Sequence, residues 1–277
     1  MCIHMNLLQQ RLCEVRSLGR KSVIPFVTAG DPSLDSLPAI LDMLAEAGAT
    51  AIEVGIPFSD PIADGPTIQA SSQRALERGV RPSDVLAALA NWENPGVPVI
   101  LMGYYNPILR MGLESFATRA KEAGAHAVIV CDLTPEEAGP WSAAAQSAGL
   151  DTIFLVAPTS TEARLDDVAR ASTGFVYAVS RTGVTGAASQ GGSPEIEGLI
   201  QKVRDRTEVP VLVGFGISSP EHVTAMCSIS DGVIVGSSLV QRLASDWNGG
   251  AGRAEILAYV KSLVEANGTG STADTVL

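Results

Sequence analysis

Eight short runs of apolar, mostly β-branched residues recur along the chain, and segments with helical spacing separate them. The runs are Val23–Val27, Ala51–Val54, Val97–Met102, Ala127–Val130, Thr152–Val156, Gly174–Val179, Val209–Val213 and Gly232–Val235. Continuous apolar strands that alternate with helices are typical of a parallel sheet covered by helices. Eight such units predict an α/β fold of one domain, a (β/α)8 TIM barrel.

The segments between the runs carry apolar residues at helical intervals. The predicted helices are Leu37–Ala47, Ser83–Trp92, Leu113–Ala123, Pro135–Ala148, Thr161–Ala171, Pro194–Arg206 and Pro220–Cys227. An extra N-terminal helix is predicted over Met5–Leu18, before the first strand. The barrel is expected to span residues 1–266, and the small, polar residues 267–277 to form a flexible C-terminal tail. An open doubly wound sheet is the alternative, but no G-x-G-x-x-G motif follows the first run.

Composition narrows the classes of partner. The 277 residues are 46% hydrophobic and carry 19 Lys and Arg against 30 Asp and Glu, a net charge of −11. This balance argues against nucleic acid or an anionic membrane as a partner, and no apolar run is long enough to cross a bilayer. An anionic substrate stays possible, because backbone N–H groups can hold phosphate. The four cysteines have neither disulfide-like nor metal-ligand spacing, so we expect no metal site, free thiols and a cytoplasmic location.

Three carboxylates lie close together at the second run. Glu53 stands inside the apolar run, and Asp60 and Asp64 follow in a loop rich in Gly and Pro. A buried carboxylate costs several kcal/mol unless it is paired, and its shifted pKa suits proton transfer near neutral pH. The active site of a barrel lies at the C-terminal ends of its strands. The pattern therefore predicts catalysis for Glu53, whereas Asp60 alone fits turn capping equally well.

Glycine-rich loops follow the last three runs. Gly214–Ser218 and Gly236–Ser238 stand where many barrels bind phosphate through backbone N–H groups and a helix N-terminus. Each loop alone is more often a plain turn, but together at these strand ends they predict a phosphate site. The long segment 180–192 predicts a lid over the substrate, with an ordinary crossover as the alternative.

Several of these segments are also sequence motifs. They are P-F-V-T-A-G-D-P at Pro25–Pro32, E-V-G-I-P-F-S-D-P-I-A-D-G-P-T-I-Q at Glu53–Gln69, Y-A-V-S-R-T-G-V-T-G at Tyr177–Gly186, G-F-G-I at Gly214–Ile217, and G-S at Gly236–Ser237. In this order and over almost the whole chain, they resemble the tryptophan synthase alpha chain family.

The resemblance implies a carbon–carbon lyase of tryptophan biosynthesis. It would cleave indole-3-glycerol phosphate by a retro-aldol step to indole and D-glyceraldehyde 3-phosphate. Glu53 would be the general acid and base, and Asp64 would stabilise positive charge on the indole N–H. Neither a metal nor a cofactor is implied for this chain.

The resemblance also assigns the remaining site residues. Phosphate would bind to Gly186, Gly216, Gly236 and Ser237. The indole pocket would be lined by Phe26, Ile68, Met102, Tyr177 and Phe215. The lid would contribute Arg181 and Thr185, and Asp60 would face a partner chain.

That partner would be a tryptophan synthase beta chain, which carries pyridoxal phosphate, in an αββα heterotetramer. Two alternatives stay open: a stand-alone indole-3-glycerol phosphate lyase that releases free indole, and a non-catalytic activator of a beta chain. Retention of both Glu53 and Asp64 argues against the activator. Turnover measured without a beta chain would separate the stand-alone lyase from the subunit.

Overall fold

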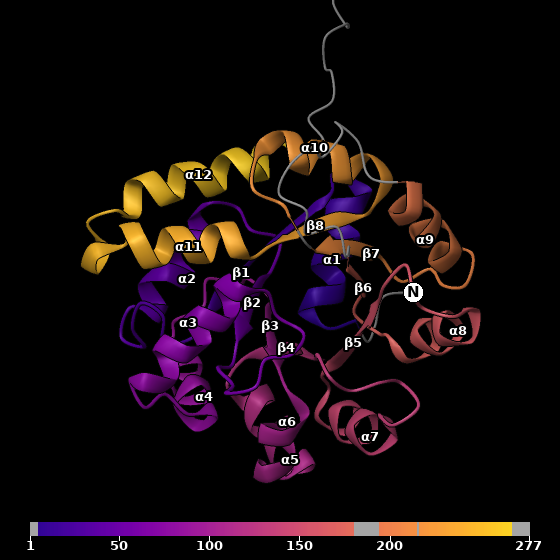
Figure 1. Ribbon diagram of the computed structural model, residues 1–277, viewed down its shortest axis with the longest axis horizontal. Helices are drawn as coiled ribbons and strands as arrows, with labels where there is room; N and C mark the ends of the chain where they lie inside the picture. Colours follow the sequence, from indigo (N-terminus) through magenta and orange to yellow (C-terminus); the bar gives the residue numbers. More distant parts are fainter. Residues whose placement is uncertain (1–4, 180–193, 215, 268–277) are drawn as a thin grey trace, which may run out of the picture.

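Eight parallel strands close into a barrel in the computed structural model (Figure 1), which describes residues 5–179, 194–214 and 216–267. The strands are β1 (Ser22–Thr28), β2 (Ile52–Gly55), β3 (Val99–Gly103), β4 (Ala125–Val130), β5 (Asp151–Val156), β6 (Val176–Val179), β7 (Val211–Gly214) and β8 (Gly232–Val235). Each strand pairs with its neighbours in chain order, and β8 pairs with β1. The predicted TIM barrel is confirmed.

Helices surround this ring of strands (Figure 1). They are α1 (Leu7–Ser17), α2 (Leu37–Glu46), α3 (Pro66–Glu77), α4 (Pro82–Ala90), α5 (Tyr105–Met111), α6 (Leu113–Glu122), α7 (Gly139–Ala148), α8 (Glu162–Ala171), α9 (Pro194–Arg204), α10 (Pro220–Ile229), α11 (Ser237–Asp246) and α12 (Arg253–Glu265), with a 3₁₀ turn at Asn248–Gly250. The sequence pattern did not mark α3, α5, α11 or α12 as separate helices.

Proline explains two shifted strand boundaries. The runs from Val97 and Val209 become strands only at Val99 and Val211, directly after Pro98 and Pro210. Proline has no N–H to donate to a ladder. Its carbonyl still pairs, because Pro98 O accepts from Ile52 N at 2.9 Å and Pro210 O accepts from Val176 N at 2.8 Å.

The strands are buried on both faces, and two apolar clusters result. Outward residues such as Val23 and Val27 pack against the surrounding helices. Inward residues such as Ile24 and Phe26 fill the barrel together with Leu8 and Leu12 of α1. Burial on both faces explains why the strands are uninterrupted apolar runs in the sequence.

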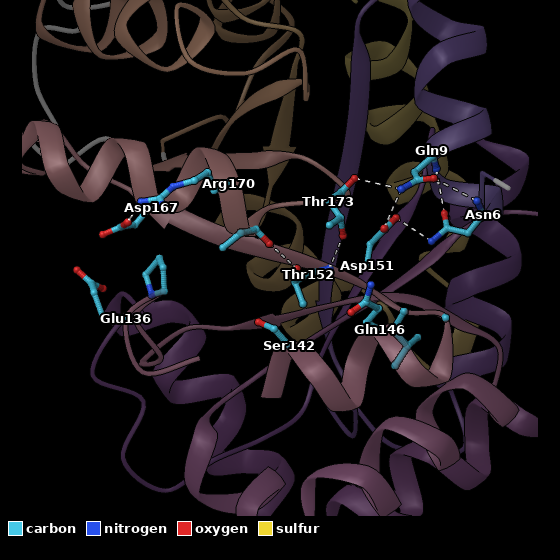
Figure 2. A pocket seen from close by; sticks show the side chains of 14 residues that line it. Asn6, Gln9, Glu136, Ser142, Gln146, Asp151, Thr152, Asp167, Arg170 and Thr173 are labelled. Atoms are coloured by element: carbon cyan, nitrogen blue, oxygen red, sulfur yellow. Dashed lines mark hydrogen bonds and ion pairs between the residues drawn. The ribbon is translucent and has the colours of Figure 1, made fainter. Parts of the chain in front are cut away.

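Helix α1 covers the N-terminal end of the barrel, and a buried carboxylate anchors it there. Asp151, the first residue of β5, accepts from Asn6 Nδ2 at 2.7 Å and from Gln9 Nε2 at 2.9 Å. Gln9 also donates to Thr173 O at 3.2 Å. Figure 2 shows these contacts in a groove of about 730 Å³ bordered by α7 and α8. With this end covered by α1, the opposite end of the barrel is the one left for chemistry.

The far end of the described chain is also anchored. Asn267 is buried, and its carbonyl accepts from Lys21 N at 3.0 Å. Asn267 was expected to begin the flexible tail, and residues 268–277 lie outside the described residues. No helix in the described part of the chain is long and apolar enough to cross a membrane.

Candidate active site

Glu53 points into the barrel from β2. Its register partners, Phe26 on β1 and Ile100 on β3, both belong to the inner apolar cluster. Glu53 is 0% exposed, and neither carboxylate oxygen has a hydrogen-bond partner among the described residues. Burial, and then the negative charge of Asp64, raise the pKa of Glu53 from 4.5 to about 8. At neutral pH this carboxyl therefore holds a proton that it can donate.

Asp64 lies in the loop between β2 and α3 and is only partly buried. Tyr104 holds it in place, because the phenol donates to Asp64 Oδ2 at 2.9 Å and accepts from Ala63 N at 3.1 Å. The Tyr104 ring also stacks on Phe58, with 5.0 Å between ring centroids. Burial raises the pKa of Asp64 to about 6, while the hydrogen bond from Tyr104 opposes the rise. At neutral pH this side chain is mostly a carboxylate.

The two carboxyl groups thus differ in protonation at one pH. Glu53 is surrounded by apolar side chains and stays neutral, whereas Asp64 receives a hydrogen bond and ionises. Groups whose surroundings separate their pKa values in this way can act as an acid and an anion side by side. The arrangement can protonate a substrate atom and stabilise the cation that forms.

Four of the five residues predicted for the indole pocket lie in or against the inner apolar cluster. Phe26 and Ile68 are buried in the inner cluster, and Met102 and Tyr177 pack against it. The Phe26 ring lies against Gly55, where a Cβ would stand 2.5 Å from Phe26 Cζ. The structure therefore brings together four of the five residues predicted for the indole pocket, and Phe215 lies outside the described residues.

Two of the four predicted phosphate residues, Gly236 and Ser237, form the start of α11. Gly236 is the N-cap and the exposed Ser237 is the first helical residue, and the first N–H groups of a helix have no partner within the helix. A Cβ on Gly236 would lie 3.8 Å from Phe26 and 4.0 Å from Ile68, so this helix end lies beside two of the residues predicted for the indole pocket. Gly216 is exposed, with a φ of +73° that favours glycine.

A hydrogen-bonded brace joins the loops after β7 and β8. Ser238 Oγ donates to Ile217 O at 2.9 Å and lies 2.8 Å from the hydroxyl of Tyr259 in α12. Tyr259 also lies 3.2 Å from Ser218 O. Ser238 is thus occupied within the protein, which leaves the neighbouring Ser237 for a ligand.

Comparison with known proteins identifies the family. The sequence model described as "Tryptophan synthase alpha chain" matches residues 12–267. A tryptophan synthase alpha chain from Burkholderia ambifaria is 47% identical over 272 residues, 97% of this chain and 100% of that one. The chain belongs to the tryptophan synthase alpha chain family.

Solved structures support the assignment to the tryptophan synthase alpha chains. Tryptophan synthase subunit alpha from Legionella pneumophila superposes with a TM-score of 0.87 at 34% identity, covering 95% of this chain and 98% of that one. A chain of Mycobacterium tuberculosis tryptophan synthase gives 0.86 at 39% identity, covering 94% and 97%.

Sequence reasoning did not identify two side chains of the candidate site in this alpha chain family member. Tyr104 follows β3 in the M-G-Y-Y-N-P stretch, where nothing in the spacing distinguishes it from Tyr105. Cys131 follows β4, and burial together with the charges of Asp64 and Glu53 raises its thiol pKa. That electrostatic coupling places Cys131 near both carboxyls.

The remaining predicted residues separate into two groups. Asp60 is exposed in the loop that carries Asp64, where its carboxylate accepts a hydrogen bond only from Ser59 among the described residues. Arg181, Thr185 and Gly186 lie outside the described residues. Within the described ranges, no three His, Cys, Asp or Glu side chains gather closely enough to hold a metal ion.

Proposed function

We propose that this member of the tryptophan synthase alpha chain family cleaves indole-3-glycerol phosphate to indole and D-glyceraldehyde 3-phosphate. The carrying observation is the buried, unpartnered Glu53, whose pKa of about 8 keeps it protonated beside the largely ionised Asp64. The inner apolar cluster suits an indole ring, and the start of α11 suits a phosphate.

The reaction follows from these protonation states. Glu53 donates its proton to indole C3, which becomes tetrahedral, and the ring takes a positive charge that the Asp64 carboxylate stabilises. The ionised Glu53 then accepts the proton of the adjacent glycerol hydroxyl. The oxygen forms a carbonyl, the bond to C3 breaks, and its electrons restore the aromatic ring. These steps need only side chains of this chain, so we propose that it uses no cofactor of its own.

Substitution of the two carboxyl groups tests this proposal. Glu53→Gln and Asp64→Asn should each reduce indole formation by roughly 10²–10⁴-fold, the usual contribution of a positioned acid or base. The measurement is the initial rate of indole release from indole-3-glycerol phosphate. Glu114→Gln, an exposed change on α6, is the matched control and should keep native turnover. Near-native turnover of Glu53→Gln would exclude it as the acid.

We further propose that the chain is the alpha subunit of an αββα complex with a beta chain, which alone carries pyridoxal phosphate. Two apolar side chains support a docking surface beside the site: Ile62, 82% exposed in the loop that carries Asp64, and Leu109, 51% exposed on α5. Asp60 lies in the same loop. Both residues follow neighbouring strands, β2 and β3, at the end of the barrel where the two carboxyls lie, and an apolar patch at that end would suit a protein partner.

The partner proposal makes a separate prediction. Ile62→Asp should weaken beta-chain binding and reduce the activation of indole formation by added beta chain, while leaving turnover of the isolated chain within about twofold. Leu18→Asp is the matched control, because Leu18 is 65% exposed at the opposite end of the barrel. Titration of each variant with beta chain measures both effects. High turnover of the native chain that does not respond to beta chain would instead favour a stand-alone lyase.

We also propose that the protein is located in the cytoplasm. Cys13, Cys131 and Cys227 are unpaired in the structure. Unpaired cysteines, one of them exposed, fit a reducing compartment.

A further inference from the structure

A small hollow lies at the N-terminal end of the barrel, opposite the two catalytic carboxyls. It measures about 290 Å³, and its lining comes from α1, the α1–β1 connection, α9 and the residues just before β7 and β8. β7, β8 and β1 are neighbours in the barrel, so the hollow faces the starts of three adjacent strands.

The lining of this hollow is strongly basic. Arg16, Arg20, Lys21 and Arg204 contribute four positive charges, and Asp231 is the one carboxylate in the lining. Asp231 is already engaged, because Oδ1 accepts from Arg204 Nη2 at 3.0 Å and Oδ2 accepts from Val211 N at 2.9 Å. The hollow therefore keeps three positive charges that no carboxylate of its lining balances.

Helix ends explain only part of this cluster. Lys21 Nζ donates to Ser230 O at 2.8 Å and Arg204 Nη1 donates to Ile229 O at 2.9 Å, both at the C-terminus of α10. Cations are favoured at such ends. Arg20 reaches only the neutral Asn267 Oδ1 at 3.4 Å, and the Arg16 guanidinium has no hydrogen bond or ion pair with any described residue.

Some arginines elsewhere on this acidic chain have carboxylate partners. Arg206 pairs with Glu162 and Asp166, and Arg253 pairs with Glu46. Carboxylates outnumber cationic side chains on this chain, which has a net charge of −11, so carboxylate partners for arginine are plentiful. A concave group of unpaired guanidiniums on the same chain concentrates positive potential at one place.

We propose that this hollow is a second anion site, separate from the active site, that binds a small phosphate-bearing anion. Its volume suits an anion of about the size of pyrophosphate rather than a large cofactor. Two planar guanidiniums can each donate two parallel hydrogen bonds to phosphate oxygens. Lys21 adds a further charge at the floor of the hollow.

Binding can be located by NMR on the full chain. Amide shifts of Gly19 and Ser22 are followed against those of Gly236 and Ser237 during titration with inorganic pyrophosphate at constant ionic strength. We expect a saturating change at Gly19 and Ser22, with its own dissociation constant. The Arg16→Gln/Arg20→Gln double variant should weaken that constant by at least about tenfold, which is about 1.4 kcal/mol.

The control is Arg110→Gln/Arg119→Gln, which removes the same charge from two exposed arginines that have no described carboxylate partner. It should keep the native constant at Gly19. Should the double variant at the hollow fail to fold, Arg16→Gln alone serves, because its guanidinium has no described partner to lose. Shifts confined to Gly236 and Ser237, a drift that does not saturate, or equal weakening in both double variants would overturn the proposal.

Discussion

Glu53 should make the folded protein less stable as pH rises, and Glu53→Gln should remove that effect. The folded-state pKa of about 8 exceeds the ordinary value of 4.5 because the carboxyl is buried without a partner. Between these two pH values the unfolded chain releases this proton and the folded chain keeps it. The folded state then binds more protons, so the free energy of unfolding falls as pH rises through this window.

The size of the effect follows from the two pKa values. Each unit of difference corresponds to about 1.4 kcal/mol, so the full loss is about 5 kcal/mol once pH exceeds 8. About 4 kcal/mol of that loss falls between about pH 5 and pH 9. This is a large share of the roughly 5–15 kcal/mol by which a typical domain is stable.

The assay is equilibrium urea unfolding of native protein and Glu53→Gln at several pH values over this range. The glutamine amide is also a buried polar group, but its cost does not change with pH. Carboxyls that do not interact with Glu53 contribute equally to both proteins. The difference between the two unfolding free energies should therefore grow in favour of the variant by about 4 kcal/mol from about pH 5 to pH 9.

A control variant and one contrary result test whether Glu53 is neutral in the folded protein. Glu114→Gln changes an exposed carboxyl in the same way, and its curve should run parallel to the native curve. Should the Glu53→Gln curve also run parallel, Glu53 would be ionised in the folded protein at neutral pH. Its assignment as a neutral proton donor would then be wrong.

Two further predictions concern hydrogen bonds. Tyr104→Phe removes the hydrogen-bond donor that lowers the pKa of Asp64. The acidic limb of the plot of kcat/KM against pH should therefore move up from about pH 6 by about one pH unit. Tyr105→Phe is the control and should leave that limb in place. Asp151→Ala removes one hydrogen bond each from the side-chain amides of Asn6 and Gln9 and should cost about 1–3 kcal/mol in urea unfolding. Asp167→Ala, on the rim of the same groove (Figure 2), should cost less than about 1 kcal/mol.

The barrel and the unusual place of Glu53 within it could be predicted because burial leaves a direct record in sequence. Strands buried on both faces must be apolar throughout, so eight runs predict eight strands. A charged residue inside such a run, Glu53, is then conspicuous, and the pattern predicts a half-buried carboxylate, whereas the structure buries it completely. The glycine loops after β7 and β8 were predicted to form a phosphate site, which stays a prediction, and the structure shows a hydrogen bond between Ser238 and Ile217 of these two segments.

The supporting contacts could not be predicted, since they depend on how side chains meet in space. Tyr104 and Tyr105 are adjacent and chemically alike, yet only Tyr104 reaches Asp64. Ser237 and Ser238 are adjacent too, and only Ser238 is tied to the loop after β7. Adjacent residues at a helix or strand end point in different directions, so only one residue of each pair makes the contact. Composition does not show which one.

The Glu53 carboxyl has no hydrogen-bond partner among the described residues, and this links the pH dependence of stability to the proposed proton transfer. A hydrogen-bond donor beside this carboxyl would stabilise its ionised form and lower its pKa, which would relieve the loss of stability at high pH. The same donor would leave less of the neutral acid at pH 7, because the pKa would fall below the working pH. Tyr104 gives Asp64 such a donor, and that side chain is needed as an anion. In the proposed mechanism Asp64 acts as an anion and receives a hydrogen bond that favours its ionised form, whereas Glu53 acts as a neutral acid and receives none from the described residues.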